Sequence, residues 1–359
     1  MVDSKQAPLD SAAAAKAAFA SVQDKPFPDD IFTAPELRWA VIGCGVIANQ
    51  MAQSLALAGR KLAGVANRTP SKAQAFAEQY GIEKVYESVE DLYADPGIDA
   101  VYITTPHNTH ITYLRDALAA GKHVLCEKAI TLNSAELDEA RAIADEHNVV
   151  LMDATTVLHM PLYQELRRRM DAGEFGRMNL AQLNFGSYKE YGDLTNRFYN
   201  RNLAGGAMLD IGVYALSVMR LFMASQPIEV VSLGNTCETG VDVAGGIVCR
   251  NAEQQLGVVS LTLHSKQPKR SIISFDKCYI EVNEYPRADH ATIVWTADGH
   301  REEVHAGTEA YALCYEMADL EKAVAGDDSK RELLGYASDV MELMTKLRAD
   351  WGVVYPEEE

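Results

Sequence analysis

The chain has 359 residues, of which 48% are hydrophobic, and carries a formal net charge of −18. Its length allows two domains with hydrophobic cores. The negative charge argues against a nucleic-acid partner, because binding a polyanion requires clustered lysine and arginine. No apolar run approaches the roughly 20 residues that span a bilayer, so no membrane is expected as a partner. Six scattered cysteines without a C-x-x-C pair, and histidines without ligand spacing, predict no disulfide framework and no metal site and favour a reduced, cytoplasmic setting.

Residues 1–36 form an N-terminal extension ahead of the first regular pattern. An alanine-rich run covers Ser11–Ala20, and either Asp10 or Ser11 suits the N-cap of a short helix. Lys16 interrupts this run, and acidic residues stand where a secretory signal would be basic, so no signal peptide is expected. The segment is either a helix that packs on another surface or a frayed tail.

Residues 37–153 alternate between strand and helix patterns and are expected to form a dinucleotide-binding (Rossmann) domain. Strands are expected at 37–42, 62–66, 85–86, 99–104, 123–126 and 149–152, with helices at 47–58, 71–80, 88–93, 111–120 and 134–147. Strands separated by helices of this length predict a doubly wound parallel sheet.

A glycine-rich turn follows the first strand of this domain. The run GCGVIA matches the G-x-G-x-x-G/A fingerprint, in which the first glycine allows a tight turn and the second lets the backbone approach a diphosphate. The diphosphate itself rests on the N-terminus of the following helix. The expected cofactor contacts here are Gly43, Gly45, Val46, Ile47 and Ala48.

The choice between NAD and NADP is read about 20 residues later, where NAD enzymes usually offer an acid to the ribose. Here the second strand ends in Asn67 and Arg68, followed by Ser71 and Lys72, with no carboxylate among them. Arg68 suits a 2′-phosphate and the adenine ring, which favours NADP over NAD. The alternative is a solvated loop in which Ser71 is the helix N-cap.

The run GKHVLCEK is the most informative in the chain. An apolar strand, His123–Cys126, stops at Glu127 and Lys128. In an open parallel sheet the carboxyl ends of the strands border the ligand crevice, so a lysine at this position favours a ligand contact. The alternative is a strand end solvated by two charges.

Residues 154–359 are expected to form a second domain for substrate binding and oligomerisation. Helices are expected at 162–170, 310–325 and 334–349, and strands at 179–188, 229–233, 244–249, 255–263, 271–275, 279–282 and 292–296. Most of these strands follow one another without helices between them, which predicts a large, open, mainly antiparallel sheet. The fold class is therefore a Rossmann α/β domain plus an α+β domain, with the active site in the cleft between them.

One helix of the second domain carries an unusual pair of polar residues. Two glycines, Gly205 and Gly206, precede it, and its Asp210 and Tyr214 stand four residues apart and so share one face. The structural alternative is a core tyrosine whose hydroxyl bonds to the aspartate.

Four motifs in this order resemble the glucose–fructose oxidoreductase/inositol dehydrogenase (Gfo/Idh/MocA) family, in particular its branch of dihydrodiol and xylose dehydrogenases. They are GCGVIA at 43–48, TPHNTH at 105–110, AGKHVLCEKA at 120–129 and GGAMLDIGVY at 205–214. Three positions depart from the family pattern: Ala129 replaces the proline of E-K-P, His107 an asparagine and Ala207 a glycine. None of these departures removes a reactive group, although the missing proline makes the backbone after Lys128 less certain.

The resemblance implies hydride transfer between nicotinamide C4 and a carbinol or carbonyl carbon of a sugar, polyol or dihydrodiol. It assigns Tyr214 as the acid/base, Lys128 as its electrostatic partner and Asp210 as the residue that positions substrate. A free tyrosine has a pKa near 10, and an adjacent ammonium lowers it.

The family motifs also carry expected binding residues. On the cofactor side these are Thr105, Pro106, His107, His110, Glu127 and Lys128, where His110 either contacts a ribose or caps a helix. On the substrate side they are Arg197, Tyr199 and Asn200, unless these belong to a surface loop.

Two functions remain open at this point. The first is an NADP-dependent oxidoreductase that acts on a carbohydrate-like small molecule. The second is a regulator of the same fold that binds NADP without chemistry. In either case a homodimer or homotetramer through the C-terminal sheet is expected.

Overall fold

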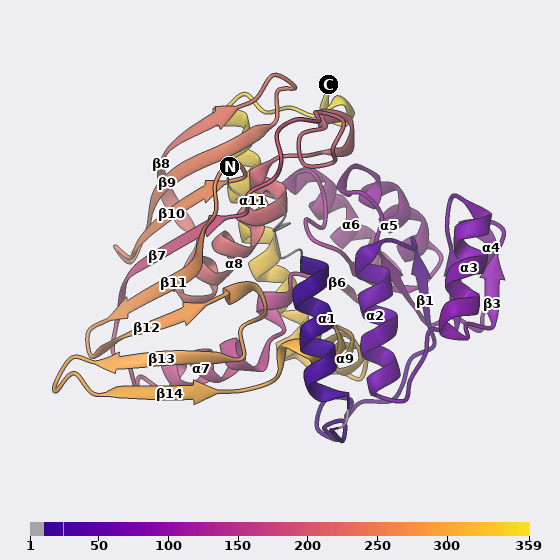
Figure 1. The fold of residues 1–359 in the computed structure, drawn as a ribbon, viewed down its shortest axis with the longest axis horizontal. Coiled ribbons are helices and arrows are strands. Elements are labelled where there is room, and N and C mark those ends of the chain that lie inside the picture. Colours follow the sequence, from indigo (N-terminus) through magenta and orange to yellow (C-terminus); the bar gives the residue numbers. More distant parts are fainter. Residues whose placement is uncertain (1–10, 24) are drawn as a thin grey trace, which may run out of the picture.

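A computed structural model describes residues 11–23 and 25–359. Helix α1 spans Ser11–Val22, as the alanine-rich run predicted; the possible N-cap at Asp10 lies outside the described residues. Val22 is buried and Phe19 packs against the core, and the helix lies beside α2 (Figure 1). The described part of the extension therefore packs on the body of the protein.

The first domain is built on a six-stranded sheet in which all neighbouring strands are parallel. Its strands are β1 (Trp39–Ile42), β2 (Gly64–Ala66), β3 (Lys84–Tyr86), β4 (Ala100–Ile103), β5 (His123–Cys126) and β6 (Leu151–Asp153), in the order β3-β2-β1-β4-β5-β6. Its helices are α2 (Val46–Leu57), α3 (Pro70–Tyr80), α4 (Val89–Ala94), α5 (His110–Ala119) and α6 (Ser134–Glu146). This order belongs to the dinucleotide-binding fold, whose ligands lie where the direction of strand order reverses, here between β1 and β4.

The second domain holds an eight-stranded sheet in the order β14-β13-β12-β11-β7-β10-β9-β8. Its strands are β7 (Met178–Gly186), β8 (Pro227–Thr236), β9 (Asp242–Asn251), β10 (Leu256–Thr262), β11 (Gln267–Phe275), β12 (Cys278–Asn283), β13 (His290–Trp295) and β14 (Arg301–His305). All neighbours are antiparallel except β7 and β10. The predicted fold class, with its mainly antiparallel sheet, is confirmed; β14 was not predicted.

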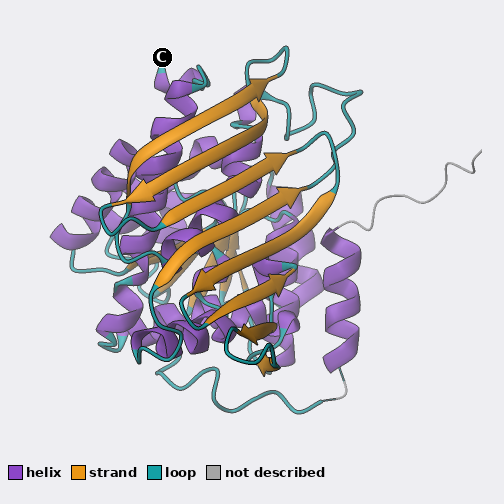
Figure 2. Ribbon diagram, turned by 90° about the vertical axis from the view of Figure 1, so that its left-hand side faces the viewer, coloured by secondary structure: helices purple, strands orange, loops and turns teal. Residues whose placement is uncertain are grey.

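Helices cover one face of this sheet and leave the other face open, which is the face turned toward the viewer in Figure 2. The helical elements of this domain are α7 (Pro161–Asp171), a π-helical turn η4 (Met208–Gly212), α8 (Val213–Phe222), α9 (Ala312–Val324), α10 (Asp328–Arg331) and α11 (Leu333–Asp350). Of these, η4 and α8 contact the central strands of the sheet, whereas α9 packs on α2 and β5 of the first domain. The open face is the surface to which oligomerisation was assigned.

One helical stretch, Arg201–Phe222, is long and apolar enough to cross a membrane by length and composition. Of its most apolar window, 78% is buried inside the fold. Such burial is typical of a helix in the hydrophobic core, where apolar residues on all sides meet protein.

Helix α9 joins the two domains through a buried carboxylate. Glu321 accepts hydrogen bonds from the Trp39 indole (3.0 Å) and from the guanidinium of Arg60 (2.8 and 3.1 Å). Because a buried charge is costly unless it is paired, these bonds fix α9 against β1 and α2. The helices of the second domain are thereby held against the strand that leads into the glycine-rich turn.

Candidate active site

The glycine-rich turn between β1 and α2 has the geometry of a diphosphate cradle. Gly43 has φ +102°, and a Cβ there would come within 2.7 Å of the Thr104 hydroxyl oxygen, so both conformation and space demand glycine. Gly45 is the N-cap residue of α2 and offers no side-chain cap, and a Cβ built on it would meet nothing within 4 Å. The N-terminus of α2 thus has no side-chain cap and has open space at Gly45, which suits an anion. The residues present fit a dinucleotide.

The loop after β2 presents its cations to solvent. Arg68 and Lys72 are exposed, and the Asn67 amide donates to the Thr69 carbonyl (3.0 Å). The alternative that made Ser71 the N-cap is wrong: α3 begins at Pro70 and Thr69 is its N-cap residue. Proline is suited to the first position of a helix, and this moves the start one residue earlier than predicted.

His110 connects two loops of the cofactor domain. Its ring is fully buried, with Nδ1 2.9 Å from the Ala129 carbonyl oxygen and Nε2 2.8 Å from the Thr105 carbonyl oxygen. The buried ring presents no surface to a ribose and caps no N–H group of α5. It holds the chain after β4 against the chain after β5, where the Lys128–Ala129 peptide is cis.

The other predicted residues of this loop lie around a short 3-10 turn. Pro106 precedes the turn and His107 opens it, while the Thr109 hydroxyl donates to Thr105 Oγ1 (2.8 Å). Burial and the nearby ammonium of Lys128 lower the pKa of His107, so its ring is neutral at neutral pH.

Glu127 follows β5 and interacts with a second acid that the sequence did not reveal. It accepts a hydrogen bond from the Tyr102 hydroxyl. Burial raises the pKa of Glu127, against the opposing effects of Tyr102 and Lys128. Glu316 on α9 is fully buried, and burial together with Glu127 raises its pKa well above the usual range. Glu316 and Glu127 are thus two buried acids that each oppose the ionisation of the other.

Lys128 brings the two domains together at one point. Its Nζ donates to the backbone carbonyl of Asp210 (2.7 Å) and to the Asp210 carboxylate (3.2 Å), and lies 4.9 Å from the centroid of the Tyr214 ring. The exposed fractions of the Lys128 and Asp210 side chains are 12% and 13%. Lys128 therefore contacts both of the other residues assigned to catalysis from the sequence, and its ammonium lies over the face of the tyrosine ring.

The protonation states follow from this burial. Burial alone would lower the pKa of Lys128, but Asp210, Tyr214 and Glu127 together outweigh it and the net direction is upward. Burial opposes ionisation of Asp210, and Lys128 and Arg197 reverse this, so the pKa of the carboxyl lies well below its usual range. For Tyr214 the expectation was wrong in sign: burial raises its pKa, and Lys128 only opposes the rise. Tyr214 is therefore a protonated phenol at neutral pH.

The three expected substrate residues have different surroundings. Arg197 is 62% exposed and lies 3.5 Å from Asp210 Oδ1, at the edge of the site. Tyr199 is fully buried, and its hydroxyl donates to the Lys189 carbonyl (3.0 Å). Asn200 caps the turn at 201–203 by accepting from the Asn202 N–H (2.9 Å). Arg197 alone of the three lies next to Asp210.

The helix that carries Asp210 and Tyr214 begins with a wide turn. In η4 the N–H of Val213 donates to the carbonyl of Met208, five residues earlier. The Met208 N–H in turn donates to the buried carboxylate of Asp242 (2.6 Å), a residue of β9 that the sequence analysis missed. π-helical turns occur frequently at functional sites. Here the turn changes the α-helical spacing that was predicted, yet Lys128 still reaches both residues.

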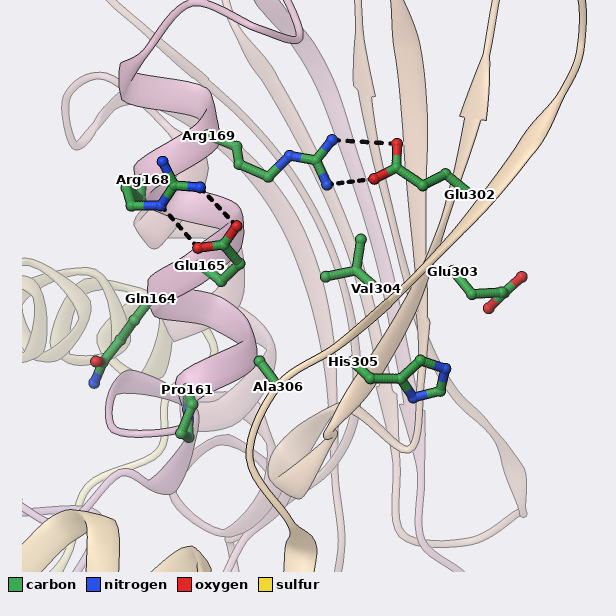
Figure 3. A pocket seen from close by; sticks show the side chains of 10 residues that line it. All are labelled: Pro161, Gln164, Glu165, Arg168, Arg169, Glu302, Glu303, Val304, His305 and Ala306. Carbon is green, nitrogen blue, oxygen red and sulfur yellow. Dashed lines mark hydrogen bonds and ion pairs between the residues drawn. The ribbon is translucent and has the colours of Figure 1, made fainter. Parts of the chain in front are cut away.

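A groove of about 630 Å³ between α7 and β14 contains none of the predicted site residues (Figure 3). Arg168 pairs with Glu165, and Arg169 pairs with Glu302, so these charges of the lining are already compensated.

Comparison with known proteins places the two domains in one family. Residues 37–155 match the GFO_IDH_MocA model, described as an oxidoreductase family with an NAD-binding Rossmann fold. Residues 163–281 match the model of the GFO/IDH/MocA C-terminal domain.

Individual relatives agree with this result. The trans-1,2-dihydrobenzene-1,2-diol dehydrogenase of Mus musculus is 32% identical over 69% of this chain and 75% of its own length. That of Sus scrofa is 28% identical over 90% and 99%. The fold resembles a 3-ketoreductase from Actinomadura kijaniata solved with NADP and TDP-benzene (TM-score 0.75, 24% identity, 88% and 98% covered). It also resembles a levoglucosan dehydrogenase solved with NADH and L-sorbose (TM-score 0.76, 20% identity, 87% and 97% covered).

The carboxyl group of Asp242 predicts a pH-dependent contribution to stability. Burial raises its pKa to about 6, whereas an unfolded aspartate titrates near 3.9. Between these values the native state binds more protons than the unfolded state, so this contribution falls as the pH rises from 4 to 6. We expect Asp242→Asn to gain stability relative to the wild type between pH 4 and pH 7, on the order of 2 kcal/mol. Urea unfolding at both pH values measures this change.

Asp276→Asn provides a control of opposite sign. Hydrogen bonds from Asn179 and the Arg177 N–H lower the pKa of Asp276, so its contribution is present above the unfolded pKa and lost as the pH falls. That variant should lose stability relative to the wild type as the pH rises. Parallel pH profiles for wild type and Asp242→Asn would contradict the assignment.

Proposed function

We propose that this chain, which belongs to the Gfo/Idh/MocA oxidoreductase family, transfers hydride between NADP and a carbinol or carbonyl carbon of a sugar, polyol or dihydrodiol-like substrate. The contact of Lys128 with both Asp210 and Tyr214 carries the proposal. It joins the end of a strand in the cofactor domain to the polar helix of the second domain. The diol dehydrogenase relatives and the sugar-acting structural neighbours support this substrate class.

Tyr214 is the proposed proton donor when a carbonyl is reduced. A bound nicotinamide supplies or accepts the hydride at its C4. Because burial keeps the Tyr214 phenol protonated, its hydroxyl can give a proton to the substrate oxygen. Lys128 stabilises the phenolate that remains, since its ammonium lies over the same ring. In the oxidative direction the same phenolate would take the proton back.

Asp210 is the proposed anchor for a substrate hydroxyl. Lys128 holds it from the buried side, whereas Arg197 approaches it from the solvent side with a largely exposed guanidinium. Exposed ion pairs contribute little free energy, so the contact with Arg197 is the one that a substrate hydroxyl can displace. Arg197 then remains close enough to contact the same substrate.

We expect Lys128→Ala and Tyr214→Phe each to reduce turnover by roughly 10²–10⁴-fold, because each removes part of the proton transfer. NADPH affinity should change little, since neither residue belongs to the diphosphate cradle. Steady-state reduction of candidate sugars, polyols and dihydrodiols, together with fluorescence titration of NADPH, measures the two effects. Tyr188→Phe, at an exposed tyrosine, is the matched control and should retain full activity.

Undiminished turnover in both variants would remove the catalytic assignment. The alternative of a regulator makes a different prediction: the wild-type protein would bind NADPH and turn over none of these substrates. The convergence of Lys128, Asp210 and Tyr214 favours the enzyme, because a site that only binds nucleotide does not require a buried proton donor with a cation on its ring.

The preference for NADP over NAD rests on Arg68. Its guanidinium is exposed and no ion pair to it is found among the described residues, so it is available to a 2′-phosphate. We expect Arg68→Ala to weaken NADPH binding by roughly 10–100-fold, which corresponds to the loss of charge-assisted hydrogen bonds, and to leave NADH binding nearly unchanged. Fluorescence titration with both cofactors measures this, with the exposed Lys61→Ala as control. Equal losses for NADH and NADPH would contradict the assignment.

The open face of the large sheet is the proposed oligomer interface. Its most exposed apolar side chains lie on β8, where Val231 and Leu233 are 75% and 84% exposed, and continue to Val248 and Leu256 on β9 and β10. Val231 stands directly opposite Val248, so the apolar surface continues from β8 to β9. Contiguous apolar patches of this kind mark interaction sites. We propose that two copies of the chain pair through this face.

Leu233→Glu should shift the protein toward the monomer, because a carboxylate would be buried without a partner in the paired sheets. Light scattering coupled to size-exclusion chromatography measures the mass across a concentration series. Asp138→Lys, at an exposed position on α6 of the first domain, is the control and should leave the mass unchanged. A monomeric wild type at all concentrations would contradict the proposal.

A further inference from the structure

The segment Val353–Glu359, here called the strap, crosses from the large sheet to the loops of the candidate active site. Its approach is fixed by Trp351 at the end of α11. The indole N–H donates to the Ser232 hydroxyl (3.0 Å), and the ring packs on Gly234 and Gly245, where any Cβ would overlap it. These two glycines are paired across β8 and β9. The strap therefore starts from a rigid surface.

On the substrate side, the strap bonds to the loop ahead of the polar helix. The hydroxyl of the fully buried Tyr355 donates to the Gly205 carbonyl (2.7 Å). Arg201 Nε donates to the Val354 carbonyl (2.7 Å). Gly205 lies five residues before Asp210, so these bonds fix the backbone from which the helix begins.

On the cofactor side, the strap bonds to two loops of the first domain. Asn108, within the TPHNTH motif, donates to the Glu357 carboxylate (2.7 Å) and to the Asn202 carbonyl (3.2 Å). Asn133 donates to the Glu358 carboxylate (3.0 Å). The strap thus contacts the loop after β4 and the chain that follows β5, as well as the substrate side.

Arg348, in the core, bonds both to the strap and to the chain after Lys128. Only 2% exposed, it binds Glu358 through two N–H groups (2.8 and 2.9 Å) and donates to the Leu132 carbonyl (2.5 Å), four residues after Lys128. Its guanidinium also lies 4.7 Å from the centroid of the Tyr355 ring. A bidentate pair with a buried arginine has a fixed geometry, so movement on one side is transmitted to the other.

We propose that Arg348, Tyr355 and Glu358 are positioning residues, and that the strap sets the distance between Lys128 on the cofactor domain and the Asp210–Tyr214 helix. This inference rests on the proposed hydride transfer. The strap touches none of the three catalytic residues. It acts through Leu132 on the chain after Lys128 and through Gly205 on the helix, and these are the two backbone segments that bring the reacting groups together.

The test uses Tyr355→Phe, which deletes one hydrogen bond, and Glu358→Gln, which weakens the pair with Arg348. We expect kcat to fall by roughly 10–100-fold in each, because small displacements of reacting groups carry losses of this size. The dissociation constant of NADPH should stay within about two-fold, since the diphosphate cradle is untouched. In the oxidative direction, a carbinol substrate deuterated at the reacting carbon should give a larger isotope effect on kcat than in the wild type, because hydride transfer becomes slower relative to product release.

Tyr336→Phe is the matched control. Tyr336 also lies on α11, and its hydroxyl accepts a hydrogen bond from Arg167 (3.0 Å), away from the strap. This variant loses a comparable bond and should keep the wild-type kcat and isotope effect. If Tyr336→Phe lowered kcat equally, the effect of the strap variants would come from a general loss of stability, and the proposal would be overturned.

Hydrogen–deuterium exchange of the protein without cofactor gives a second readout. In Tyr355→Phe and Glu358→Gln, peptides covering 105–110 and 205–212 should both exchange faster, and in Tyr336→Phe neither should. Faster exchange confined to 353–359, with unchanged kcat, would overturn the proposal. If the wild type showed no turnover of any substrate, the proposed function would fail, while the exchange pattern would still decide whether the strap couples the two loops.

Discussion

The buried ion pair between Lys128 and Asp210 is the interaction on which the site depends. Two charges that are 12% and 13% exposed would each lose several kcal/mol of hydration if unpaired. Their pairing, with a further hydrogen bond from Lys128 to the Asp210 carbonyl, offsets that cost only while the two domains stay in register. If the cofactor sheet and the polar helix moved apart, both charges would be left buried without a partner. The ion pair therefore favours one relative position of the two domains.

The same pair determines which groups carry protons. Lys128 stays charged because Asp210 is ionised, and its charge helps to keep the adjacent His107 neutral. Tyr214 stays protonated because burial outweighs the ammonium above its ring. Burial and the nearby Glu127 raise the pKa of Glu316 well above its usual range. The labile proton next to Lys128 and Asp210 is thus on the Tyr214 phenol, where the proposed carbonyl reduction requires it.

Periodicity predicted most of the fold because strands and helices that face a core must repeat their apolar positions locally. β5 was predicted at its observed bounds, and most other elements shifted by one to three residues at their ends. β14 was missed because an edge strand of sequence REEVH has too few apolar residues to show alternation. The parallel pairing of β7 with β10 was missed for another reason: it depends on a crossover through α8, β8 and β9, which no local pattern encodes.

The site divides in the same way between local and long-range information. Lys128, Asp210 and Tyr214 lie within motifs whose order and spacing resemble one family, so their grouping around Lys128 could be predicted, and their catalytic roles are proposed on that basis. Residues whose role depends on one distant partner could not be predicted. The hydrogen-bond partner of Asp242 is 34 residues away in the sequence, that of Tyr355 is 150 residues away and that of Arg348 is 216 residues away. Each is a buried polar side chain that bonds to a backbone group. Because every residue type has a backbone carbonyl and nearly every type an N–H, the sequence does not show which residue is the partner. Tyr199 is the opposite case. Its position beside a motif predicted a ligand contact, but its hydroxyl donates a hydrogen bond to a backbone carbonyl in the core. Sequence patterns thus identify groups that act on a ligand more readily than groups that hold the backbone in place for them.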